Sequence, residues 1–280
     1  MNTEIEQYIK NALEEDIAHI GDLTSLATIS KDAVGEARFI VKEDCIIAGI
    51  ELVKSISYII DPKLKVDFSV QDGDEILNLQ VIGSIQGNTH SILLAERLML
   101  NCMQRMSGIA TKVAGLKKMI QSYPAKILDT RKTTPNNRII EKWAVRIGGG
   151  YNHRFGLYDM ILIKDNHIKA AGSVTEALQK TKSFLNEQNS SIPVVIEVKN
   201  EIELKEALAF ELVDRILLDN MSPEQVMEMI QITAKKKPLE VSGGVNKDNI
   251  LHYAATGVDY ISLGDITHHI QSVDISLKII

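Results

Sequence analysis

The chain has 280 residues, of which 45% are hydrophobic and 24% are charged. This composition is typical of a globular protein and excludes a disordered or fibrous chain, while the length fits one large α/β domain or two smaller domains. The net charge of −6 argues against binding of nucleic acid by bulk charge, because proteins that bind in that way usually carry a basic excess. Any anion that this chain binds must therefore meet a local group of positive side chains.

The N-terminal segment is acidic and amphipathic, and its spacing predicts a surface helix over residues 3–15. It has neither the basic start nor the apolar core of a signal peptide, and no run in the chain approaches 18 uncharged apolar residues. Cys45 and Cys102 share no motif spacing, so we expect two small core residues rather than a disulfide or a zinc site. These features predict a cytoplasmic protein that contacts no membrane.

Residues 35–88 contain short β-rich runs separated by glycines, with a turn at Asp72-Gly73-Asp74 and an amphipathic stretch over Ile50–Ile60. They predict a small α+β domain. A long helix is expected over 89–107, with a buried stripe that contains Ala95, Leu98, Met99, Cys102 and Met106. We expect Gly108 to end this helix and a second helix to run from about 109 to 121. The predicted boundary between an N-terminal domain (1–108) and a second domain (109–267) lies at this glycine.

Six short apolar runs, beginning near residues 126, 160, 194, 215, 239 and 260, are separated mostly by stretches of helical character. Strands that alternate with helices imply a parallel sheet. A glycine-rich nucleotide-binding turn after the first strand is absent, which argues against an open doubly wound sheet. We therefore predict an α/β protein in which an N-terminal α+β domain precedes an incomplete (β/α) barrel, whose catalytic mouth lies at the strand C-termini.

Charged residues and glycines stand at the C-terminal ends of these runs or in the connections that follow them. The basic members are Arg131, Lys132, His153, Arg154 and Lys164, and the two acids are Glu197 and Asp219. Arginine and lysine at one mouth suit a substrate with several carboxylates or phosphates, and carboxylates suit Mg²⁺. Ser242-Gly243-Gly244 and Leu263-Gly264-Asp265 end the last two strands, where barrels commonly bind phosphate through backbone N–H groups.

The segment from Asp129 to Ile168, DTRKTTPNNRIIEKWAVRIGGGYNHRFGLYDMILIKDNHI, resembles the signature of the quinolinate phosphoribosyltransferases. The motifs GDLTS, AERLMLN, SGIAT, IEV, LLDN, SGG, TGVDYISLGDITH and DISLKI follow the order of that family from end to end. The resemblance implies that quinolinate and 5-phosphoribosyl diphosphate react in the presence of Mg²⁺. The products are nicotinate mononucleotide, diphosphate and CO₂, and the reaction belongs to NAD biosynthesis. The resemblance also implies that the C-terminal tail (268–280) packs on the first domain and that the protein is a homodimer or a dimer-based hexamer.

The resemblance also implies roles for individual residues. Arg97 would reach into the partner subunit's site and contact quinolinate. Substrate contacts are expected from Arg131, Lys132, Thr133, His153, Arg154 and Lys164, and contacts to the 5′-phosphate from Ser242, Gly243, Gly244, Leu263, Gly264 and Asp265. Glu197 and Asp219 would lie near the ribose hydroxyls and the metal, directly or through the substrate. We expect Lys132, Lys164, Glu197 and Asp219 to be catalytic.

Two positions depart from the family pattern. Val195 stands where many relatives have glutamate, so Glu197 is the acid that remains on this strand. Asn136-Asn137 stands where relatives often have glycine, and asparagine tolerates positive φ better than most residues, so the turn can survive.

Three alternatives remain open at this point. The first is a relative with another substrate, either a ModD-like protein of molybdenum-transport operons or a nicotinate phosphoribosyltransferase. The second is a Schiff-base aldolase with Lys164 as nucleophile, which would need a desolvated lysine. The third is a regulator that binds a phosphometabolite without turning it over.

Overall fold

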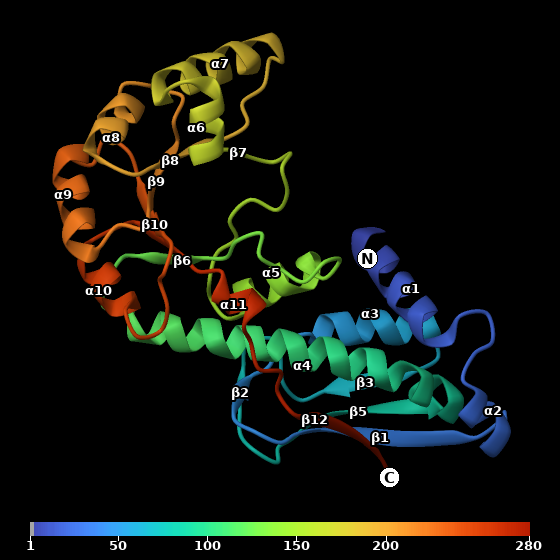
Figure 1. Cartoon of the computed structure of the whole chain (residues 1–280). Coiled ribbons are helices and arrows are strands. Elements are labelled where there is room, and N and C mark those ends of the chain that lie inside the picture. Colours follow the sequence, from blue (N-terminus) through green and yellow to red (C-terminus); the bar gives the residue numbers. More distant parts are fainter. Residues whose placement is uncertain (1–2) are drawn as a thin grey trace. The chain divides into compact units, whose positions relative to one another are not determined.

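The computed structural model describes residues 3–280, and the chain forms two compact units (Figure 1). The first unit contains the chain up to Ala114 together with Thr134–Gly149 and His269–Ile280. The second unit contains Gly115–Thr133 and Gly150–His268. The first unit therefore extends beyond residue 108, the predicted domain boundary, and it includes two later segments of the chain.

The first unit holds an antiparallel sheet with the strand order β12-β1-β5-β3, and β2 pairs with β4 beside it. The strands are β1 (Val34–Val41), β2 (Cys45–Ile46), β3 (Lys65–Phe68), β4 (Glu75–Ile76), β5 (Val81–Asn88) and β12 (Ile275–Ile279). Alternate residues of β1, namely Ala37, Phe39 and Val41, are buried, as expected for a sheet with one face on a core. The pairing of β12 with β1 brings the end of the chain into this sheet.

The helices of this unit are α1 (Thr3–Ile17), α2 (Leu23–Thr28), α3 (Ile50–Ile60), α5 (Arg138–Ile147) and most of α4 (Thr89–Met119). The amphipathic stretch over residues 50–60 forms α3. Its start is stabilised from a distance, because the Asp72 carboxylate accepts hydrogen bonds from the backbone N–H groups of Gly49 and Ile50. Cys45 and Cys102 are buried free thiols, and the predicted apolar stripe of α4 is buried throughout.

The predicted helix break at Gly108 is wrong, because α4 continues through this residue to Met119. A Cβ at Gly108 would collide with the backbone carbonyl of Gln271 and lie 3.3 Å from the Cα of Ser272. Glycine is thus required there because the C-terminal segment crosses the helix at backbone distance, and not because the helix ends.

The second unit contains a six-stranded parallel sheet, in the order β6-β11-β10-β9-β8-β7 within the described residues. Its strands are β6 (Lys126–Leu128), β7 (Ile161–Ile163), β8 (Val194–Val198), β9 (Arg215–Asp219), β10 (Leu239–Ser242) and β11 (Tyr260–Ser262). All six predicted strands are therefore confirmed. Every residue of β8 is buried, which is typical of a parallel strand covered on both faces.

Helices follow the strands along the chain: α6 (Asp165–Ala171), α7 (Val174–Glu187), α8 (Glu201–Leu208), α9 (Pro223–Thr233), α10 (Ile250–Ala255) and α11 (Asp265–His268). In Figure 1, α7 to α10 follow the outer side of the curved sheet. The terminal strands of the sheet are β6 and β7, so the barrel is incomplete, as predicted. Among residues 3–280, no helix is long and apolar enough to cross a membrane.

Candidate active site

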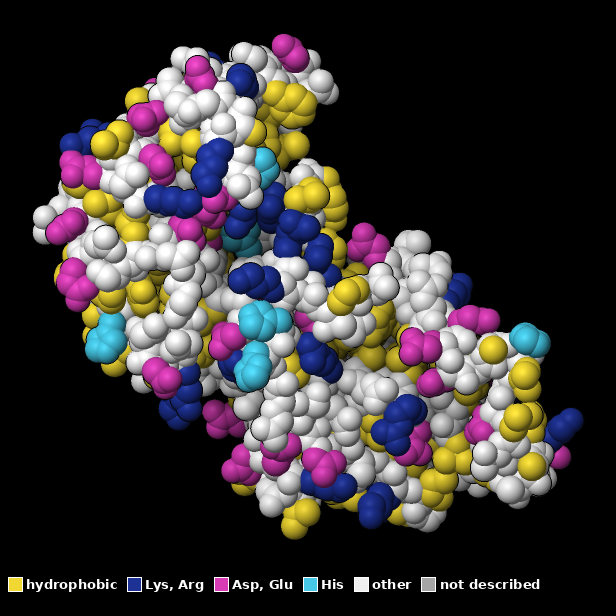
Figure 2. All heavy atoms as spheres, in the orientation of Figure 1, with side chains coloured by type: hydrophobic (Ala, Val, Ile, Leu, Met, Phe, Trp, Pro, Cys, Tyr) yellow, Lys and Arg dark blue, Asp and Glu magenta, His cyan; other side chains and the backbone are white. Residues whose placement is uncertain are grey.

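A pocket of about 660 Å³ lies at the C-terminal ends of the barrel strands, and all of its lining residues belong to the second unit. Figure 2 shows Lys and Arg side chains gathered together with acidic and His side chains on this unit. The predicted site residues that line the pocket are Arg131, Lys132, His153, Arg154, Lys164, Glu197, Asp219, Ser242, Gly243, Gly244, Gly264 and Asp265. Residues widely separated in sequence are therefore brought together at one mouth.

Three predicted site residues do not line this pocket. Thr133 lies next to the lining residue Lys132 and is half-buried. Leu263 is buried, and its backbone N–H donates to the carbonyl of Leu128 across the sheet. Arg97 is exposed on α4 in the first unit.

The floor of the pocket comes from strand interiors. Side chains of paired residues in neighbouring strands point to the same face, so Leu217 on β9 and Glu240 on β10 share the inner face. Leu162 and Ser262 complete the floor. It is therefore partly apolar, with one buried carboxylate.

The positive side chains of the pocket are close enough to repel one another. Burial, and then the charge of Arg131, lower the pKa of the Arg154 guanidinium. Arg154 is also held by a hydrogen bond from its Nη1 to the carbonyl of Met160 at 3.3 Å. An arginine remains charged at neutral pH, so an anion placed between these two groups would relieve their repulsion.

The two predicted acids lie in different surroundings. Glu197 is only 7% exposed, and one of its carboxylate oxygens lies 3.3 Å from Nζ of Lys164. Asp219 ends β9 and is half-buried. Lys164 itself is half-exposed, so it lacks the desolvation that a Schiff-base nucleophile requires.

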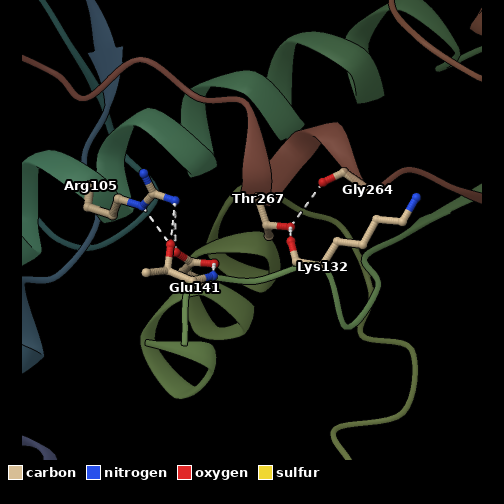
Figure 3. Close-up of polar contacts among 6 residues, drawn as sticks. Arg105, Lys132, Glu141, Gly264 and Thr267 are labelled. Atoms are coloured by element: carbon tan, nitrogen blue, oxygen red, sulfur yellow. Dashed lines mark hydrogen bonds and ion pairs between the residues drawn. The ribbon is translucent and has the colours of Figure 1, made fainter. Parts of the chain in front are cut away.

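The loop that follows β6 is anchored by α11 (Figure 3). The hydroxyl of Thr267, a fully buried residue, donates to the backbone carbonyl of Lys132 at 2.8 Å and lies 3.1 Å from the carbonyl of Gly264. A Cβ at Gly264 would lie 2.8 Å from Cδ of Lys132, so glycine leaves the space that the lysine stem occupies. Lys132 is therefore positioned by both ends of the Gly264–Thr267 turn.

A second anchor lies further along the same loop, within the first unit (Figure 3). Glu141 is fully buried on α5 and accepts hydrogen bonds from Nε and Nη2 of Arg105 at 3.1 and 2.8 Å. Its other oxygen accepts the backbone N–H of Thr134 at 3.2 Å. Asn136 adopts φ +66°, which confirms that asparagine can support this turn.

The glycines after β10 leave room at the mouth. Gly243 and Gly244 have φ of +91° and +66°, a backbone region that favours glycine. A Cβ at Gly243 would collide with the side chain of Asn220, whereas one at Gly244 would meet nothing within 4 Å. The backbone of this turn is therefore accessible to a bound group.

Sequence reasoning missed several pocket residues: Thr130, Leu162, Leu217, Asn220, Glu240, Val245, Ser262 and His268. Of these, His268 is exposed at the pocket wall. Glu240 is fully buried and lies in the apolar run LEVS. A charged residue inside such a run is the signal that could have identified it.

Glu240 belongs to a buried polar cluster with Arg215, His153 and Ser262. Its Oε2 lies 2.8 Å from Nε of Arg215, in an ion pair whose N–H is not aligned for a hydrogen bond. Its Oε1 accepts the Ser262 hydroxyl and lies 3.5 Å from Nε2 of His153. Burial alone would raise the pKa of Glu240, but His153 and Arg215 outweigh burial, so the pKa is lowered and the carboxylate is ionised.

The chain is similar to known proteins over nearly its whole length. The model of the quinolinate phosphoribosyl transferase N-terminal domain matches residues 22–107, and that of the C-terminal domain matches residues 109–278. A tobacco (Nicotiana tabacum) quinolinate phosphoribosyltransferase is 43% identical over 99% of this chain and 82% of its own length. A probable nicotinate-nucleotide pyrophosphorylase of Bacillus subtilis is 38% identical over 99% and 93%. The solved nicotinate-nucleotide pyrophosphorylase of Francisella tularensis superposes with a TM-score of 0.91 at 38% identity, covering 100% and 97%.

Proposed function

The chain belongs to the quinolinate phosphoribosyltransferase family, and from this premise we propose that its barrel pocket holds both substrates of the family's reaction. The activity is that of a decarboxylating quinolinate phosphoribosyltransferase, EC 2.4.2.19, in NAD biosynthesis. Quinolinate and 5-phosphoribosyl diphosphate give nicotinate mononucleotide, diphosphate and CO₂. The observation that carries the assignment to this pocket is the grouping of four Lys and Arg side chains with the carboxylates of Glu197 and Asp219.

The positive side chains suit the charges of the substrates. Quinolinate has two carboxylates, and arginine binds a carboxylate through two parallel hydrogen bonds. Arg131 and Arg154 are the pair that an anion would bridge, while Lys132 and Lys164 supply further charge. The glycine-rich turns at Gly243-Gly244 and Gly264 leave backbone accessible for the 5′-phosphate.

Bond formation and decarboxylation follow from charge placement. The ring nitrogen of quinolinate attacks C1 of the ribose as diphosphate leaves, and Glu197 and Asp219 stabilise the positive charge that develops on the sugar. The nitrogen is then quaternary, so the 2-carboxylate leaves as CO₂ because the ring cation stabilises the remaining carbanion. The carbanion takes a proton at C2 from water, which gives nicotinate mononucleotide. The residues act by holding the two substrates in line and by neutralising charge, and a protein base is not required.

Magnesium fits this pocket as an ion that arrives with the diphosphate. Within residues 3–280, no three His, Cys, Asp or Glu side chains are grouped as a metal site, so Glu197 and Asp219 could supply only part of a ligand set. Mg²⁺ usually keeps several waters and bridges substrate phosphates, which suits two carboxylates on neighbouring strands. Bound there, it would offset charge on the departing diphosphate.

The proposed assembly is a homodimer in which Arg97 of one subunit reaches the pocket of its partner. The support is that Arg97 is exposed and does not line the pocket of its own chain. We place the protein in the cytoplasm, where reducing conditions suit the two buried free thiols.

Product analysis tests the reaction. The purified chain is incubated with quinolinate, 5-phosphoribosyl diphosphate and Mg²⁺, and nicotinate mononucleotide, diphosphate and CO₂ are measured. Nicotinate is the matched control substrate, because it lacks only the carboxylate that leaves. Equal or faster turnover of nicotinate would favour the nicotinate-type alternative, and tight binding without turnover would favour a regulator.

A further inference from the structure

His153 and Glu240 form a buried cluster in the floor of the pocket, to which the proposed reaction gives no role. His153 was expected to neutralise a substrate carboxylate, yet it is only 8% exposed. The backbone N–H of Arg154 donates to Nδ1 of His153 at 2.7 Å. Nε2 of His153 lies 3.5 Å from Oε1 of Glu240 and 3.4 Å from Nη2 of Arg215. Both ring nitrogens of His153 therefore face protein groups.

These contacts determine where the ring proton lies. Because Nδ1 accepts the N–H of Arg154, it carries a lone pair, and the proton of a neutral ring must be on Nε2. The ionised oxygen of Glu240 is the acceptor that this N–H faces. Nη2 of Arg215 is itself a donor, so its 3.4 Å contact with Nε2 is not a hydrogen bond in this tautomer. Arg215 already balances the charge of Glu240, so a neutral His153 leaves the buried cluster without net charge.

The cluster is connected to the mouth through Arg154. The backbone N–H of His153 donates to the buried carboxylate of Asp129 at 2.8 Å, which fixes the main chain at this point. The ring then fixes the next residue, whose guanidinium lines the pocket. A change at the strand interior can therefore move an arginine at the mouth.

We propose that Glu240 is a positioning residue: it holds His153 as the Nε2–H tautomer, so that Nδ1 fixes the backbone of Arg154 and aims its guanidinium at a substrate carboxylate. His153 then acts through Arg154 and offers no ring N–H to the substrate. The role given to Arg154 rests on the proposed function.

The first test measures the ring directly. The ligand-free full chain is labelled with ¹⁵N-histidine, and the ring signals of His153 are assigned from the spectrum of His153→Asn. We expect a protonated Nε2 and an unprotonated Nδ1 that accepts a hydrogen bond. A ring protonated at Nδ1, or at both nitrogens, overturns the proposal whether or not the chain turns over quinolinate.

The second test separates positioning from the stability of a buried ion pair. Arg215→Met with Glu240→Gln and Arg215→Met with Glu240→Met both remove the two charges, and replacement of a whole buried pair is often tolerated. The variants differ in one respect, because only glutamine keeps an oxygen that can accept the His153 N–H. Thermal melting confirms that both are folded at the assay temperature.

The kinetics of the two double variants distinguish a positioning role of Glu240 from a role in stability alone. We expect the KM for quinolinate to be at least about tenfold higher with methionine than with glutamine at position 240, as for a lost hydrogen bond to a charged group. The KM for 5-phosphoribosyl diphosphate should differ far less. Equal quinolinate KM values for two folded variants would contradict positioning by Glu240, whereas failure of the unmutated chain to form product would contradict the proposed function alone.

Discussion

Single side chains at the mouth must supply the positive charge that the chain lacks overall. Arg131→Ala removes one of the two guanidinium groups that an anion would bridge. We expect kcat/KM for quinolinate to fall about 10- to 100-fold, the range for a charge-assisted hydrogen bond. The measurement is quinolinate-dependent release of CO₂.

A matched control for Arg131→Ala removes charge without touching the pocket. Lys54→Ala does so, because Lys54 is an exposed residue of α3 that pairs with Glu51 in the first unit. Its turnover should stay within about twofold of the unmutated chain, as for most surface substitutions. A similar loss in both variants would mean that net charge, and not the pocket, governs binding.

The two cysteines are predicted to be inert. Burial raises the pKa of Cys45 and of Cys102 to about 11, and the reactive species is the thiolate. At about pH 8 both therefore stay protonated, and thiol reagents should modify neither in the folded protein. Both should react quickly after unfolding in guanidinium. Rapid labelling of the folded chain would show that one thiol lies in a charged, accessible setting.

At the residue scale, the sequence was most informative where polar groups end a strand. Arg131, Lys164 and Asp219 stand at such ends, so a parallel sheet alone brings them together. Glu240 is different, because its role depends on Arg215 and His153, which lie 25 and 87 positions away. Periodicity cannot specify such pairings.

At the scale of elements, α4 shows why a glycine is ambiguous in sequence. Gly108 and Gly115 are both helical, and propensity treats them alike. A Cβ at Gly108 would meet the backbone of Gln271, while one at Gly115 would meet nothing within 4 Å. The first glycine is required by packing of a distant segment, which local sequence does not reveal.

This difference makes the two glycines a matched pair. Gly115→Ala should raise the free energy of unfolding by about 0.5–1 kcal/mol, because alanine loses less backbone entropy in a helix. Gly108→Ala should lower it by about 1–3 kcal/mol through overpacking against the C-terminal segment. Urea unfolding measures both values. Equal increases in the free energy of unfolding for the two variants would show that the segment around Gln271 does not cross α4 at backbone distance.

The turn of α11 makes a second prediction at this scale. Thr267→Val keeps the shape of the side chain but removes the hydroxyl that donates to the carbonyl of Lys132. We expect a loss of about 1 kcal/mol in stability and a fall in kcat, because the loop that carries Lys132 loses an anchor. Thr267→Ser keeps the hydroxyl and should restore most of the turnover. No difference between valine and serine would exclude this anchoring role.

For the whole molecule, net charge and local charge have different consequences. A total of −6 disfavours bulk attraction of polyanions, yet the pocket groups Arg131, Lys132, Arg154 and Lys164. Arg97 is not among the lining residues, and the proposed assembly has a second chain supply it. Complementation between subunits tests that assembly.

Arg97→Ala and Lys164→Ala should each be inactive alone, since each removes a positive group from every site. In a mixed dimer, one site combines the intact barrel of the first variant with Arg97 of the second. An equal mixture of freely exchanging subunits should therefore recover about a quarter of the intact sites. CO₂ release measures the recovery, and differently tagged subunits prove exchange. Proven exchange without recovery would mean that Arg97 serves no partner's pocket.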